Sequence, residues 1–198
     1  LALSGVRDMS LIATPPVDRL AVRTFVGGWD GLVLKEALIR ERFRGGQSFV
    51  VCPRIADLNR VYEKLVKMVP DLRIFTAYGK MAPNELDDVM TNFGEGKADV
   101  LLSTNIIESG IDIPTANTII IYRADMFGLA QLYQLRGRVG RSKERAYSYL
   151  TTDPDLILTA QAKRRLDVMQ TLDTLGAGFS LASYDMDIRG AGNLLGDE

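Results

Sequence analysis

The residues best suited to chemistry lie in the octet 134–141, which holds arginines at 136, 138 and 141 and glycines at 137 and 140. Guanidinium groups stay charged at physiological pH and donate paired hydrogen bonds to phosphate oxygens. Glycines let the backbone approach a ligand or a neighbouring domain closely. Taken alone, the octet is compatible with a phosphate-binding loop or with a solvated basic turn.

A second polar segment comes about 20 residues earlier. Residues 98–104 are expected to form a strand, and residues 105–114 a loop punctuated by glycine and proline. Thr104 lies at the end of the expected strand, and Gly110 and Asp112 lie in the loop. By itself this segment also fits an ordinary connection between a strand and a turn.

Apolar patterning predicts the elements that must position these residues. Strands are expected at 47–53, 73–78, 99–103, 118–122 and 146–151, and helices at 30–44, 55–68, 83–93 and 128–135. Such alternation predicts an α/β fold with a parallel sheet and helices on both of its faces. In sheets of this kind the ligand-binding loops lie at the carboxyl ends of the strands, and residues 105–114 occupy one such position.

The pattern changes at about residue 152, from which only helices are expected. One helix is predicted to end at Gly176 and a second to span 179–188, followed by a glycine-rich loop. We interpret this region as a helical hairpin appended to the sheet. No strand precedes the glycines, which argues against a dinucleotide site, and Asp197 and Glu198 lack the buried strand that a magnesium-binding acidic pair requires.

Composition excludes several classes of protein. The 198 residues include no histidine and a single cysteine, so a zinc site is not expected. Cys52 lies in an apolar run, which predicts a buried small side chain. No apolar run approaches the roughly 20 residues that cross a bilayer, so no membrane contact is expected. The net charge of −1 argues against a globally basic protein but leaves room for a local phosphate-binding surface.

Together, the two polar segments resemble motifs V and VI of superfamily 2 helicases and translocases. Residues 104–114 match T-x-x-x-x-x-G-I-D-x-P, residues 134–141 match Q-x-x-G-R-x-G-R, and residues 78–81 stand where the family has H-G-x-M. The resemblance implies that Arg138 and Arg141 are catalytic and stabilise charge on the transferred phosphoryl group. The residues it implies for nucleotide binding are Gln134, Gly110 and Asp112. Those it implies for the DNA backbone are Thr104, Asn105, Gly79 and Lys80.

The whole chain resembles the bacterial transcription-repair coupling factors, most clearly at residues 3–8, 12–16, 112–132 and 185–192. Members of that family are cytoplasmic motors that move along double-stranded DNA with ATP and Mg²⁺. They displace stalled RNA polymerase and act with excision-repair factors. RecG-type branch-migration translocases share motifs V and VI and the tail, and are the alternative. Residues 6–8 and 12–16 favour the coupling factors.

The resemblance implies that residues 1–151 form a second RecA-like motor domain, with residues 1–20 a connector from a first motor domain. It implies that residues 152–198 form a translocation hairpin with a truncated loop, whose halves Arg165 and Arg189 hold together. The chain lacks the G-x-x-x-x-G-K-[ST] and D-E-x-[HQ] motifs. ATP and Mg²⁺ are therefore expected to bind mainly upstream, and this chain alone is expected to be inactive. A non-catalytic nucleic-acid-binding module is the other alternative.

Overall fold

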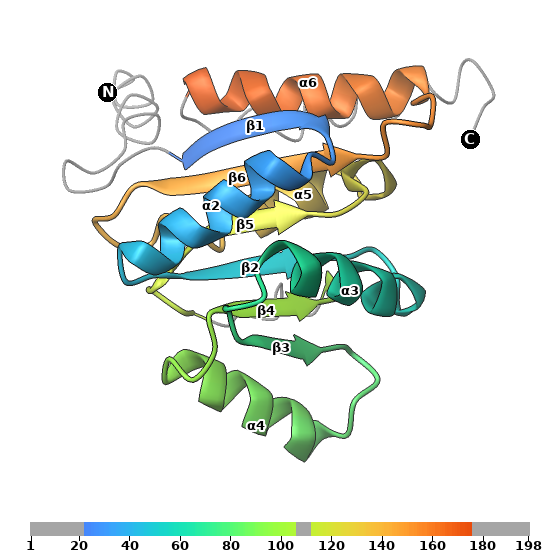
Figure 1. The fold of residues 1–198 in the computed structure, drawn as a ribbon. Coiled ribbons are helices and arrows are strands. Elements are labelled where there is room, and N and C mark those ends of the chain that lie inside the picture. The colour runs from blue at the N-terminus through green and yellow to red at the C-terminus, as the bar shows by residue number, and fades with distance from the viewer. Residues whose placement is uncertain (1–21, 106–111, 176–198) are drawn as a thin grey trace, which may run out of the picture.

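The computed structural model describes residues 22–105 and 112–175, which form a six-stranded, wholly parallel sheet with helices on both faces (Figure 1). The strand order is β1-β6-β5-β2-β4-β3. The strands are β1 Val22–Gly28, β2 Gln47–Val51, β3 Ile74–Ala77, β4 Val100–Ser103, β5 Ala116–Ile121 and β6 Ala146–Thr152. The helices are α2 Gly31–Phe43, α3 Leu58–Met68, α4 Pro83–Gly94, α5 Leu129–Arg136 and α6 Ala160–Leu175, with short 3-10 turns η1 Ile55–Asp57 and η3 Ala124–Met126. The α/β fold expected from the sequence is confirmed.

The central strands β2, β4 and β5 are buried along their whole length, which explains why they read as continuous apolar runs. Successive side chains point to opposite faces of the sheet. On one face Val50, Leu102 and Ile120 pack under α2 and α3, and on the other Phe49, Leu101 and Ile119 pack under α4, α5 and α6. Each face therefore has its own apolar core.

The strand β1 was not expected from the sequence. Its apolar and polar residues do not alternate regularly. Much of this edge strand is exposed, and it ends in two glycines. It is held by a seven-residue parallel pairing with β6, from Val22 opposite Ala146 to Gly28 opposite Thr152. Tertiary pairing, rather than local pattern, makes these residues a strand.

The helix α6 corrects our expectation of an appendage. It lies along β1 (Figure 1), and its Leu166, Met169 and Leu172 are buried in the same core as α5 and the sheet. The apolar spacing was identified correctly, but periodicity cannot say which surface a helix covers. The second expected helix and the glycine-rich loop lie outside the described residues, as does the expected connector 1–20, and the division at residue 152 stays a prediction.

The side chain of Cys52 is fully buried after β2, as expected. Burial, aided by the negative charge of Asp57, raises the pKa of its thiol to about 12. At pH 8 only about one thiol in 10⁴ is then ionised, and the thiolate is the reactive form. We predict no measurable alkylation by iodoacetamide in the native chain over an hour at pH 8. The same chain in 8 M urea (roughly full unfolding) should react completely, and equal rates in the two states would contradict the prediction.

No helix in the described part of the chain is both long and apolar enough to cross a bilayer.

Candidate nucleotide and DNA sites

The predicted site residues divide between the two edges of the sheet. Asp112 precedes β5, while Arg138 and Arg141 precede β6, so all three lie at the amino edge. Thr104 follows β4 and Lys80 follows β3, which places them at the carboxyl edge. At about 3.3 Å per residue, strands of four to six residues separate the edges by roughly 13–20 Å. The residues predicted to bind nucleotide therefore lie at the amino edge, and not at the carboxyl edge where ligand-binding loops were expected.

At the amino edge, Arg141 and Asp112 lie side by side although 29 positions separate them in the sequence. The Arg141 Nε is 3.3 Å from the Asp112 Oδ1, and their side chains are 39% and 62% exposed. An exposed pair of this kind contributes about 0–1 kcal/mol to stability. A phosphate that enters here can therefore replace Asp112 as the partner of Arg141 at small cost.

The other nucleotide candidates surround this pair unevenly. Gln134 is exposed in the last turn of α5, and Arg138 is half-buried where the loop leaves that helix. Gly110 lies outside the described residues. Thus the structure brings Arg141 to Asp112, and assigns no contact between that pair and Gln134.

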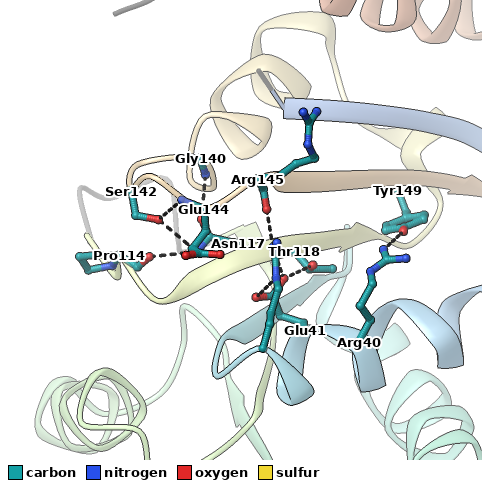
Figure 2. A network of polar contacts seen from close by, with 11 residues as sticks. Arg40, Glu41, Pro114, Asn117, Thr118, Gly140, Ser142, Glu144, Arg145 and Tyr149 are labelled. Carbon is teal, nitrogen blue, oxygen red and sulfur yellow. Dashed lines mark hydrogen bonds and ion pairs between the residues drawn. The ribbon is translucent and has the colours of Figure 1, made fainter. Parts of the chain in front are cut away.

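Asn117, which the sequence reasoning missed, connects the segment before β5 to residues 137–145 (Figure 2). These residues join α5 to β6 and are called the arginine loop below. Its Nδ2 donates to the Pro114 carbonyl at 3.2 Å and to the Ser142 Oγ at 3.3 Å. Its Oδ1 accepts from the Gly140 amide at 3.3 Å. The side chain is 2% exposed, so these contacts take the place of water. A polar residue at the start of an otherwise apolar strand was the available signal.

A buried charge pair supports the end of the same loop, where Glu41, on α2, is 1% exposed. It accepts from both Arg44 Nε at 3.0 Å and Arg44 Nη2 at 2.8 Å, and from the Thr118 hydroxyl at 2.5 Å. Arg44 also donates to the Arg145 carbonyl, one residue before β6 (Figure 2). Burial lowers the pKa of Arg44, but the hydrogen bond to Glu41 and the carboxylate charge outweigh it, and the net shift is upward.

At the carboxyl edge, the start of motif V is tied to β3. The Thr104 amide donates to the Ala77 carbonyl at 3.3 Å, and Thr104 is 8% exposed. Asn105 is half-buried beside it, whereas Gly79 and Lys80 are exposed. The turn 78–81 is braced by the Tyr78 amide, which lies 3.4 Å from the Met81 sulfur. Of the predicted DNA residues, Gly79 and Lys80 are the most accessible.

Two further arginines lie at this edge and were not predicted. Arg54 follows β2 and is 53% exposed, and its hydrogen bonds to the buried Asp57 raise its pKa. Arg123 follows β5 in the left-handed region, at φ 55°, and the bidentate hydrogen bond to Asp125 raises its pKa. A basic residue directly after a buried strand was the signal that could have found both.

Arg165 does not face open solvent from α6 but reaches the 3-10 turn after β5. Its Nη2 donates to the Asp125 carbonyl at 3.1 Å, which ties α6 to η3. Arg189 lies outside the described residues, so the role of the two arginines in the hairpin stays a prediction.

Comparison with known proteins identifies the family. The helicase conserved C-terminal domain matches residues 32–143, a span that includes both members of the Arg141–Asp112 pair. The chain belongs to the helicase C-terminal domain family. Over its full length it is also 58% identical to the transcription-repair-coupling factor of Myxococcus xanthus and 52% identical to that of Escherichia coli K12. The resemblance to coupling factors is therefore confirmed. The chain spans only 16% and 17% of the length of those two relatives.

Solved structures agree with this family and with the RecA-like fold. The structure of RecG bound to a three-way DNA junction matches at 40% identity and a TM-score of 0.75. The match covers 91% of this chain and 24% of the RecG chain. A second match is domain 2 of the DEAD-box helicase Mss116p bound to an RNA duplex, at 18% identity and a TM-score of 0.59. It covers 75% of this chain and 60% of the Mss116p chain. The second likeness concerns the fold alone.

Within the part of the helicase domain that the structure describes, no group of three or more histidine, cysteine, aspartate or glutamate side chains could hold a metal ion.

Gly140 is the glycine of the arginine loop that the fold constrains most. Its φ is +81°, and a Cβ there would lie 2.9 Å from the Val22 Cγ2, which the stiff branched side chain cannot easily avoid. We predict that Gly140→Ala lowers the free energy of unfolding by about 2 kcal/mol or more. This total exceeds the ~1 kcal/mol expected from left-handed strain alone, because the new Cβ also meets Val22. Gly45→Ala is the matched control, because its φ is +83° and nothing lies within 4 Å. Equal losses in urea unfolding would show that the Val22 contact is unimportant.

Proposed function

We propose that this chain is the second motor half of an ATP-dependent double-stranded DNA translocase that displaces stalled RNA polymerase and couples transcription to nucleotide excision repair in the bacterial cytoplasm. Full-length identity of 52–58% to coupling factors supports the choice of family. The observation that carries the mechanism is the placement of Arg141 beside Asp112 at one edge of the sheet, with the candidate DNA residues at the other.

On the nucleotide side, Arg141 and Arg138 stabilise the negative charge that develops on the transferred phosphoryl group of ATP. The catalytic benefit arises because this charge appears mainly in the transition state, after a first motor domain has closed on the loop. Asp112 pairs with the Arg141 side chain until phosphate replaces it, and then faces the nucleotide ribose. ATP and its Mg²⁺ are held mainly by that first domain.

On the DNA side, the carboxyl edge contacts the phosphate backbone. Thr104, Asn105, Gly79 and Lys80 take this role, and the exposed guanidinium of Arg54 extends the surface. Contacts to phosphate carry no sequence information, so they suit a motor that must move over any sequence. Thr104 at the DNA edge and Asp112 at the nucleotide edge are only eight positions apart in the sequence, so the two sites are joined by a short stretch of chain.

The second candidate is a RecG-type branch-migration translocase. It is supported by the 40% identity to RecG over 91% of the chain. A non-catalytic binding module is the third, and it predicts that the arginines matter for affinity but not for turnover.

The test uses the full-length protein and this 198-residue chain in parallel. We expect the full-length protein to displace a triplex-forming strand and a stalled RNA polymerase with ATP, and to have little activity on branched junctions. The isolated chain should show no ATP hydrolysis above background. It should bind duplex DNA weakly, without sequence preference, and with an affinity that falls steeply as salt rises. Efficient junction migration without polymerase displacement would favour the RecG type, and tight, salt-insensitive binding by the isolated chain would favour the binding module.

A further inference from the structure

The side chain of Asn117 makes hydrogen bonds to two segments that are remote from each other in the sequence. Pro114 ends the segment that carries Asp112, whereas Gly140 and Ser142 flank Arg141 on both sides. Asn117 itself is fixed at the start of β5, in the middle of the sheet. One buried amide thus holds the neighbours of both members of the Arg141–Asp112 pair.

The pair cannot hold itself in position, since it is exposed and contributes about 0–1 kcal/mol. Asn117 is 2% exposed, and its three hydrogen bonds, one buried and two part-buried, join it to Pro114, Gly140 and Ser142. Hydrogen bonds made by a buried side chain fix the groups that they join more firmly than an exposed ion pair does. The Gly140 amide donates to the Asn117 Oδ1 from a residue in the left-handed region, one position before Arg141. The loop is therefore registered on the sheet by Asn117 and not by Asp112.

We propose that Asn117 is the positioning residue that sets the reach of Arg141 in phosphoryl transfer. This inference rests on the proposed function. Asn117 touches neither nucleotide nor DNA; it acts by keeping the backbone on both sides of Arg141 at a fixed place relative to Asp112. A displacement of about 1 Å in a catalytic group costs up to about 10²-fold in rate.

The test is steady-state ATPase of the full-length protein at saturating duplex DNA. We expect Asn117→Ala to lower kcat about 10- to 100-fold and to leave the KM for ATP within about twofold. Gln47→Ala is the matched control. Gln47 is also a buried amide at the amino end of a strand, with hydrogen bonds to Phe93, Ala98 and Thr115, but none to the arginine loop. It should lower the melting temperature about as much as Asn117→Ala while kcat stays within about twofold.

A double-mutant cycle separates positioning from general destabilisation. If Asn117 acts through Arg141, the Asn117→Ala/Arg141→Ala double variant should have a kcat within about threefold of Arg141→Ala alone. The reason is that the guanidinium positioned by Asn117 is already absent. A merely structural role would multiply the two losses. Ser142→Ala, at a half-buried side chain, provides a milder second variant with an expected 3- to 10-fold loss, should Asn117→Ala fail to fold.

The outcomes are distinguishable. Wild-type kcat in Arg141→Ala would refute the proposed function itself. A large loss in Arg141→Ala, together with near wild-type kcat in Asn117→Ala and Ser142→Ala or with fully multiplying losses, would leave that function standing and overturn the role of Asn117.

Discussion

Replacing Arg141 with alanine in the full-length protein should lower DNA-stimulated ATP turnover by about 10³- to 10⁵-fold. The affinity for ATP should change little, because the arginine meets charge that exists mainly in the transition state. Arg138→Ala should have a loss of the same kind. The double variant should be little worse than the worse single one, since residues that act as a unit show strongly non-additive effects. Steady-state kinetics and equilibrium nucleotide binding measure the two quantities.

Lys143→Ala is the matched control, because Lys143 is an exposed cation in the same loop, two positions from Arg141. Its kcat should stay within about threefold of wild type, as for a surface charge with only long-range influence. If Lys143→Ala lowered kcat as much as Arg141→Ala, the loop would act through its overall charge, and the specific catalytic role proposed for Arg141 would be wrong. If Arg141→Ala instead weakened ATP affinity and left kcat intact, the binding-module class would be favoured.

Arg44→Ala should lower the free energy of unfolding of this chain by about 3 kcal/mol, near the lower end for a broken buried ion pair. The variant leaves the Glu41 carboxylate, 1% exposed, with only the Thr118 hydroxyl among its described hydrogen-bond donors. It also removes the donor to the Arg145 carbonyl, so the end of the arginine loop loses its support from α2. The lower end is expected because Arg44 itself is 24% exposed, and water can enter part of the space it leaves.

Urea unfolding monitored by circular dichroism measures this loss. Lys97→Ala is the control, since its pair with Glu95 is 59% and 56% exposed and should contribute about 0–1 kcal/mol. A loss below about 1 kcal/mol for Arg44→Ala would mean that water takes the place of Arg44 beside the Glu41 carboxylate at little cost. The pair would then contribute little to stability, and Asn117 would contribute more than Arg44 to holding the loop.

These two predictions concern the same loop from opposite sides. Arg141 lies on the exposed surface of the loop and is proposed to act on substrate. Arg44 and Glu41 lie between the loop and α2 and support the loop from that side. A variant of the first kind should lose rate without losing stability. A variant of the second kind should lose stability first, and rate only as far as the loop moves.

The sequence alone determined the central strands and the residue types for phosphate chemistry. The apolar runs at 47–53, 99–103 and 118–122 predicted buried strands, because their composition and length are local properties of the chain, and the structure has strands there. The motif spacing at 104–114 and 134–141 likewise identified the helicase relationship before any coordinates.

The tertiary structure alone decided which edge of the sheet each motif occupies and what holds it there. The strand β1 and the placement of α6 depend on pairing and packing with distant residues, which local periodicity does not encode. The partners of Asn117 and Glu41 include residues 25 and 77 positions away. A buried polar side chain reads in sequence as an interruption of a pattern. Its role appears only when the fold shows which donors and acceptors it satisfies, because burial is what makes those contacts obligatory.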